Sequence, residues 1–283
     1  MVLGGDVAGK AVIPLVARGG GYVAEELGGE HIYGQSEVAD LEKQIRDMGF
    51  YPARLSAQEF QRAKEDSAFV SELFLAVMQE ELRSWLELAK QRLKGTSVRL
   101  YMMLGNDDEP ALKRVIADSN VATDPEDEII DLGEGLQMAS CGWANITPWH
   151  SPRELPEEEL KARLEISIQR LVDPARSVWN FHVPPLNTSI DRAPQLDDKL
   201  KPLVSGGSVI LKSVGSAAVR ALIDRHQPLL GLHGHIHEAR GVARLGRTVC
   251  INPGSQYADG VLDGALVVLD QKRGIKHYQL VSG

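Results

Sequence analysis

The sequence has few cysteines, few aromatic side chains and no long apolar run. Two of its 283 residues are cysteines, Cys141 and Cys250, which is too few for a disulfide framework and typical of buried free thiols. No apolar run approaches the roughly 20 residues of a membrane-spanning helix, and no cleavable leader precedes Gly5-Asp6. We therefore expect a cytoplasmic protein with no membrane partner.

Positive charge is also scarce. The chain has 31 Lys and Arg against 39 Asp and Glu, a formal net charge of −8, and no basic run. A nucleic-acid backbone is therefore not an expected partner, because proteins that grip it show a basic patch or stripe. Hydrophobic residues make up 43% and charged residues 25%, as in ordinary globular proteins. The length suits one large domain, and we predict a single domain over residues 1–283.

Helical periodicity dominates residues 36–94. Apolar residues recur at helical spacing from Ser36 to Gly49 and again from Phe69 to Leu93, and Ser56-Ala57-Gln58-Glu59 has the form of a capping box. These signals predict a helical insert at about 36–94. Elsewhere the patterns predict short strands, helices that begin near Pro156 and Ala217, and a β-meander after Arg240; the expected strands include 98–104, 128–131, 136–141, 177–182 and 229–232.

Polar residues with ligand atoms follow four of the expected strands. Asp6, Asn106 and His182 each follow or end a strand, and His233-Gly234-His235-Ile236-His237 follows another. Sites in α/β folds gather at the carboxyl ends of strands, and imidazole is the commonest metal-ligating side chain. We therefore predict a site for one or two divalent transition metals. Mixed oxygen and nitrogen donors suit Mn, Fe, Zn, Co or Ni ions, with Mn as the first expectation.

The order of these blocks resembles a known family. Gly5-Asp6, Gly105-Asn106, the lone His182 and Gly234-His235-Ile236-His237 are similar to the motifs of calcineurin-like metallophosphoesterases over essentially the whole chain. The resemblance implies an α/β fold, an αββα sandwich of two mixed sheets flanked by helices. Further blocks resemble an uncharacterised bacterial and archaeal group: Gly9-Lys10, Thr147-Pro148, Pro152-Arg153-Glu154 and Asn252-Pro253-Gly254-Ser255.

The resemblance also implies a ligand set and a reaction. Asp6 would bridge two metals, Asn106, His182 and His235 would complete the second metal site, and His237 would bind the first. The implied enzyme is a phosphomonoesterase or phosphodiesterase in which a metal-bound hydroxide attacks the phosphorus of a small phosphate ester in line.

Four further residues are candidates for work on the substrate. Where the family carries a histidine after Gly-Asn, this chain has Asp107; it or Asp108 would protonate the leaving group, which requires a raised pKa. His150 and Arg153 are candidate substrate-binding residues, although a packed loop histidine is an alternative for His150. For His233, packing or support of the ligands is expected rather than metal binding.

A second departure from the family concerns the first strand. The family begins with a strand that ends in Asp-x-His, and no such strand precedes Gly5-Asp6 here, so an exposed strand edge and apolar surface are expected. An alternative function is therefore a non-catalytic or one-metal module that binds a partner protein. A zinc-dependent hydrolase of another bond, such as an amide, ranks last because no Glu general base lies beside a histidine pair. The oligomeric state is not predicted.

Overall fold

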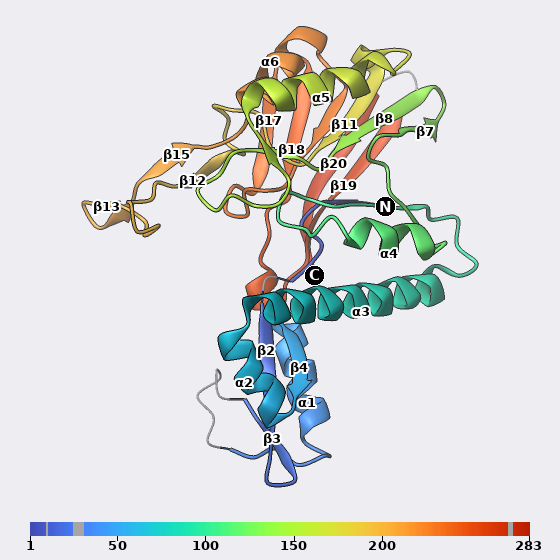
Figure 1. Cartoon of the computed structure of the whole chain (residues 1–283). Helices are drawn as coiled ribbons and strands as arrows, with labels where there is room; N and C mark the ends of the chain where they lie inside the picture. The colour runs from blue at the N-terminus through green and yellow to red at the C-terminus, as the bar shows by residue number, and fades with distance from the viewer. Residues whose placement is uncertain (10, 25–30, 271–273) are drawn as a thin grey trace.

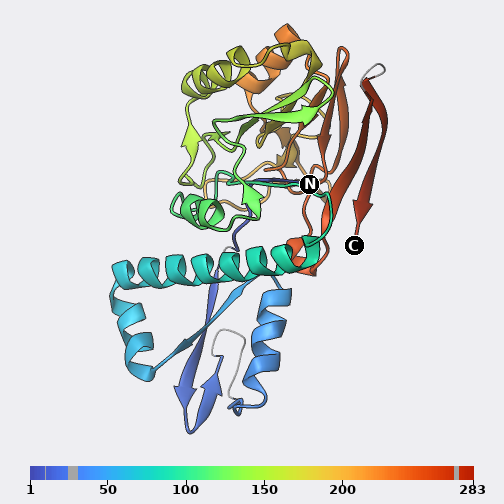
Figure 2. The ribbon, with the colours of Figure 1, turned by 90° about the vertical axis from the view of Figure 1, so that its right-hand side faces the viewer.

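The computed structural model describes all residues except 10, 25–30 and 271–273. Lys10, one of the residues behind the resemblance, therefore lies outside the described residues. The chain has a mixed α/β architecture with a larger lobe built on a six-stranded sheet and a smaller lobe below it (Figures 1 and 2). No helix among the described residues has the length and apolar character needed to cross a membrane.

The six-stranded sheet forms the centre of the larger lobe. Its strand order is β17-β18-β16-β11-β8-β7, in which the four inner strands run parallel and the two edge strands antiparallel. The strands are β7 (Ile129–Gly133), β8 (Leu136–Cys141), β11 (Ser177–Phe181), β16 (Leu230–Leu232), β17 (Gly241–Leu245) and β18 (Thr248–Asn252). The β-meander prediction is wrong, because β18 inserts beside β16 and the last two strands leave for another sheet.

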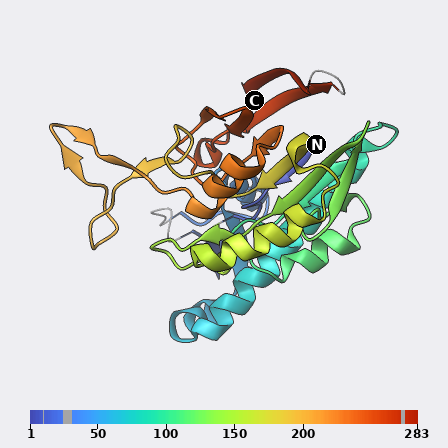
Figure 3. The ribbon, with the colours of Figure 1, turned by 90° about the horizontal axis from the view of Figure 1, so that it is seen from above.

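Helices α5 (Glu157–Gln169) and α6 (Ala217–His226) cover one face of this sheet, as the view in Figure 3 shows. Leu160 and Leu164 recur at helical spacing on α5 and pack with Trp179 of β11 and Leu222 of α6 in one buried cluster. Cys141 and Cys250 lie in the same cluster as free thiols, which confirms the expectation from the sequence. This apolar contact fixes the position of β11, whose end leads into the site.

The opposite face of the sheet packs against a second layer of strands. This layer holds a sheet of order β1-β5-β6 and a hairpin, and Tyr101, Val178, Leu230 and Val267 share a core between the layers. Helices α3 (Ser67–Leu93) and α4 lie on the outer side of β5. As expected from the sequence, β1 lies at the edge of its sheet. The elements are β1 (Val2–Gly4), β5 (Leu100–Met103), α4 (Leu112–Asp118), β6 (Ala122–Thr123), β19 (Asp263–Asp270) and β20 (Gly274–Ser282).

The smaller lobe is formed by residues inserted in the sequence between β1 and β5. Its helices follow the predicted pattern, and Ser56 and Glu59 form the predicted capping box. The insert is not wholly helical, however, because residues 51–55 form an edge strand of a sheet of order β3-β2-β4. This strand was not predicted because it contains Pro52, and proline within a run argues against a strand except at the edge of a sheet. The elements are β2 (Val12–Arg18), β3 (Gly21–Val23), α1 (Val38–Asp47), β4 (Tyr51–Leu55), α2 (Ala57–Glu65) and α3 (Ser67–Leu93).

Residues 192–213 form a projecting segment, the arm. It leaves the larger lobe beside the sheet and extends away from it (Figures 1 and 3), and it was not predicted from the sequence. Its strands are β12 (Arg192–Pro194), β13 (Val204–Ser205), β14 (Ser208–Val209) and β15 (Leu211–Ser213). The remaining short elements of the described residues are β9 (Ala144–Asn145), β10 (Glu154–Leu155) and 3-10 turns at Pro174–Arg176 and Tyr257–Asp259.

Candidate metal centre

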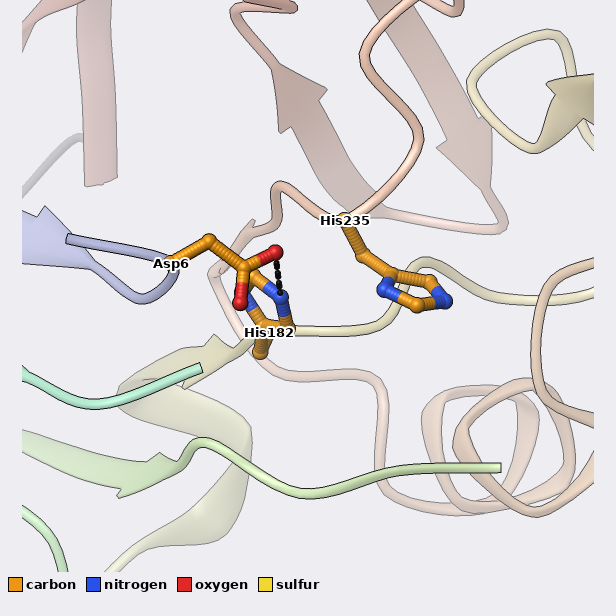
Figure 4. A group of neighbouring side chains, drawn as sticks. All are labelled: Asp6, His182 and His235. Carbon is orange, nitrogen blue, oxygen red and sulfur yellow. Dashed lines mark hydrogen bonds and ion pairs between the residues drawn. The ribbon is translucent and has the colours of Figure 1, made fainter. Parts of the chain in front are cut away.

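Four strand ends meet at one point, as the sequence pattern indicated. The carboxylate Oδ2 of Asp6 lies 3.0 Å from Nε2 of His182, and Oδ1 of Asn106 lies 3.2 Å from the same nitrogen. Nδ1 of His235 lies 2.7 Å from Asn106 Oδ1. Figure 4 shows Asp6, His182 and His235 converging from three separate loops. Ligand atoms of these three residues all lie within 4.8 Å of one another, so the group has the compactness of a cation site.

The hydrogen bonds of His182 indicate whether a cation fits among these ligand atoms. Its Nδ1–H donates to the carbonyl oxygen of Gly4 at 2.9 Å, an atom that can only accept. In the neutral ring Nε2 therefore carries a lone pair, and that lone pair faces the oxygens of Asp6 and Asn106. Acceptors facing one another are stable only with a proton or a metal ion among them. The donor set thus fits a divalent transition metal.

Charges within the site follow from burial and from the pairing of Asp6 with His182. Burial alone would raise the pKa of Asp6, but the charge and hydrogen bond of His182 outweigh it and hold that pKa well below its ordinary value. Burial opposes protonation of His182, yet Asp6 raises its pKa overall. Burial and the neighbouring His182 lower the pKa of His235 to about 3. An ionised carboxylate and a neutral imidazole are the forms that bind metals.

Unusual backbone geometry places these side chains. Asp6 and His235 have positive φ angles of 51° and 64°, a conformation that non-glycine residues rarely adopt and that concentrates at functional sites. The loop after β5 passes so close that a Cβ added at Gly105 would lie 2.1 Å from Oδ1 of Asp6 and 2.3 Å from its backbone nitrogen. Glycine is therefore required at position 105 for Asp6 to reach the group.

This contact gives a testable prediction. Gly105→Ala should displace Asp6 and abolish binding of Mn²⁺ by the purified chain, because the new methyl group overlaps both the carboxylate and the backbone of Asp6. Gly264→Ala on β19 is the control, since its Cβ meets its nearest neighbour at an ordinary 3.5 Å. Metal analysis after dialysis and circular dichroism measure the outcome. Unchanged Mn²⁺ binding by folded Gly105→Ala would contradict the assignment.

Asp107 and Asp108 have opposite surroundings although they are adjacent. Asp107 is exposed in the cleft, its backbone N–H donates to Asp6 Oδ1 at 3.1 Å, and its carboxylate accepts from the hydroxyl of Ser151. Asp108 is 1% exposed, and its carboxylate accepts hydrogen bonds from three backbone N–H groups. The prediction of Asp108 as a leaving-group acid is therefore wrong, because its oxygens are buried away from the cleft.

The carboxylate of Asp108 joins two loops. It accepts the N–H groups of Val7 and Ala8 at 3.0 and 2.9 Å and that of Gly105 at 2.7 Å. Burial and the charge of Asp6 raise the pKa of Asp108, against the effect of its backbone donors. The residue thus ties the loop after β1 to the loop after β5 and positions Asp6 beside Asn106.

The prediction that Arg153 binds substrate is wrong, because this residue does not face the cleft. It is 3% exposed, and its guanidinium donates to the carbonyl oxygens of Leu104 and Gly105 and pairs with Glu126. A buried arginine needs such partners, because an unpaired charge in the interior is strongly destabilising. Its role in the structure is to hold the end of β5, not to face the cleft.

The remaining histidines divide between the core and the cleft. His233 is buried, donates Nδ1–H to Phe181 and Val183 carbonyl oxygens, and burial lowers its pKa to about 4; this confirms the packed interpretation. His237 lines the cleft with its ring edge-on to Tyr257, outside the group of converging ligand atoms found among the described residues. Its role at a first metal stays a prediction. His150 is exposed and lines the same cleft.

Three supporting hydrogen bonds complete the site. Asn252 donates its amide N–H to the carbonyl oxygen of Ile236 at 2.8 Å, and Ser255 N–H donates to that of His237 at 3.1 Å, so this turn holds the histidine loop. Glu154 accepts a long hydrogen bond of 3.4 Å from Nδ2 of Asn106. That bond orients the Asn106 oxygen toward the histidines, a relation that spacing alone does not reveal. No role for this glutamate follows from the sequence beyond its place in the Pro152-Arg153-Glu154 motif.

Comparison with known proteins leaves the family of this chain open. No family model matches it. Uncharacterized protein MJ1162 of Methanocaldococcus jannaschii is 29% identical over 149 residues, which is 50% of this chain. The chain spans 59% of the length of that relative.

Two solved structures show a likeness to this chain. The crystal structure of TT1561 of Thermus thermophilus has a TM-score of 0.45 and 17% identity over 72% of this chain and 79% of that chain. Another crystal structure has a TM-score of 0.52 and 15% identity, and covers 95% of this chain and 97% of that chain. The second likeness shows a shared α/β fold over nearly the whole length.

Proposed function

We propose that the chain is a metal-dependent phosphohydrolase of the calcineurin-like metallophosphoesterase type, with its helices and two sheet layers forming an αββα sandwich. The convergence of Asp6, Asn106, His182 and His235 from four strand ends carries the proposal. The order of these residues along the chain and the lone pair of His182 facing two oxygens support it. A location in the cytoplasm goes with this proposal.

The four residues of the group share one task in this mechanism, and two neighbouring groups orient two of them. Asp6, Asn106, His182 and His235 would hold one or two divalent transition metals, which supply an activated water and positive charge against the phosphoryl oxygens. The Gly4 carbonyl fixes the ring of His182, as hydrogen bonds to metal-ligating histidines commonly do. Glu154 orients Asn106 in the same way.

Asp107 is the better placed of the two neighbouring acids for proton transfer. Its side chain lies in the cleft next to Asp6, and the hydroxyl of Ser151 donates to it. His150 lines the same cleft and stays the candidate for contact with the substrate. A protonated group at either position would serve to protonate the leaving oxygen.

Hydrolysis of two chromogenic esters tests the proposal. The chelator-treated chain, supplied with Mn²⁺, should release nitrophenolate from p-nitrophenyl phosphate or bis-p-nitrophenyl phosphate, and further chelator should stop the reaction. Absence of turnover with Mn²⁺, Zn²⁺, Fe²⁺, Co²⁺ and Ni²⁺ would overturn it. Metal bound at no more than one equivalent without turnover would instead favour the one-metal module that binds a partner protein.

A further inference from the structure

The cleft at the metal centre is much larger than the centre itself. It has a volume of about 1020 Å³ and includes Asp6, Asn106 and His235 among its lining residues. From there it extends between the loop of residues 145–151 and the arm. Pockets for whole organic ligands span about 300–1,000 Å³, so the cleft has room for a substituent well beyond a phosphate group.

The part of the cleft beyond the metal centre has an apolar wall. Trp149 is 63% exposed, Ile146 49% and Leu200 46%, although large apolar side chains gain free energy when they leave water. The wall comes from both sides of the cleft and includes Ile146, Trp149, Leu186, Leu196, Leu200 and Val214. An apolar ligand would bury these side chains together.

Positively charged side chains along this wall are scarce, and two of its polar side chains are already engaged within the protein. Lys212 is the one Lys or Arg among the described residues that line the cleft. The hydroxyl of Thr147 donates to Glu154, and both carboxylate oxygens of Glu157 accept from the first residues of α6 and their cap. Asn145, Lys212 and Ser213 offer a few polar groups beside the wall, fewer than the hydroxyls and ring atoms of a sugar or nucleoside would need, and polar groups left without partners are costly.

We propose that the substrate is a phosphate ester of an extended apolar alcohol, with its phosphate at the metal ions that Asp6, His182 and His235 would hold and its alkyl or aryl part along the wall. This inference rests on the proposed function, and it names the substrate class of that site. The continuity of one cleft from the ligand group to the arm carries it. An ester dissolved as a monomer and a lipid phosphate in a bilayer share this chemistry.

A homologous ligand series tests the wall without requiring turnover. Ethyl-, butyl-, hexyl- and octylphosphonate are titrated calorimetrically into the Mn²⁺-loaded chain. The dissociation constant should fall about fourfold for each buried methylene. Leu196→Ser and Trp149→Ala should flatten this dependence. Val204→Ser, at an exposed position of the arm outside the cleft, should leave it unchanged.

Hydrolysis of p-nitrophenyl alkyl phosphodiesters and of alkyl phosphates of the same lengths gives the second readout. Failure of every ester, with length-dependent phosphonate binding retained, would overturn the proposed function and leave the apolar wall. Binding and hydrolysis that do not depend on length, or a preference for nucleotides or sugar phosphates, would overturn the inference. Phosphatidic acid in phosphatidylcholine vesicles, compared with monomeric octyl phosphate, identifies the source of the substrate.

Discussion

Asp6→Asn should lower kcat/KM for an aryl phosphate at least about 100-fold, because changes to residues that merely support metal ligands already cost 10- to 100-fold. The substitution keeps the shape of the side chain but removes the charge that pairs with His182. Initial rates at fixed Mn²⁺, together with metal content, measure the effect.

The control for this substitution is Asp118→Asn. Asp118 is an exposed carboxylate on α4 that pairs with Arg114, so its loss should leave the rate within about twofold. Circular dichroism checks that both variants are folded. An Asp6→Asn chain that keeps more than half of the activity would show that the carboxylate is not part of the reacting centre.

Asp108→Ala should destabilise the fold by about 2 kcal/mol or more, because it leaves one buried and two partly buried backbone N–H groups without an acceptor, and a buried unsatisfied donor costs about 1–3 kcal/mol. The donors belong to Val7, Ala8 and Gly105. Urea unfolding followed by circular dichroism gives the difference from the unsubstituted chain.

The neighbouring Asp107→Ala supplies the matched comparison. Its side chain is exposed, so this change should cost less than about 1 kcal/mol while it lowers the rate of hydrolysis. Equal stability of the two variants would contradict the assignment of Asp108 as the tie between the two loops.

The pair of acids shows where sequence reasoning ends. Both follow Asn106 at a strand end, and spacing gives no reason to separate them. The turn after β5 directs one carboxylate into the cleft and the other toward backbone N–H groups 100 residues away. Arg153 is a similar case, because only tertiary contacts reveal that its guanidinium is held inside the protein by Glu126 and two carbonyl oxygens.

The strand ends were predictable for a different reason. β5 and β16 are short apolar runs and β11 is mostly apolar. A polar residue follows β11 and β16 at once and follows β5 after Leu104-Gly105, and packing of such runs into sheets brings their ends together. The arm lacks such a signal. Its paired segments are two or three residues long and expose Val204, Val209 and Leu211. No periodic pattern in the sequence therefore indicates the arm or the apolar wall that it contributes to the cleft.

Direct metal binding tests the central claim most plainly. The chain is stripped with chelator, dialysed against Mn²⁺ and examined by elemental analysis, beside Asp6→Asn and His182→Gln. The geometry of the group predicts at least one tightly held ion per unsubstituted chain and a clear loss in both variants. Equal metal content in all three proteins, or none in the unsubstituted chain, would contradict a metal centre at these residues.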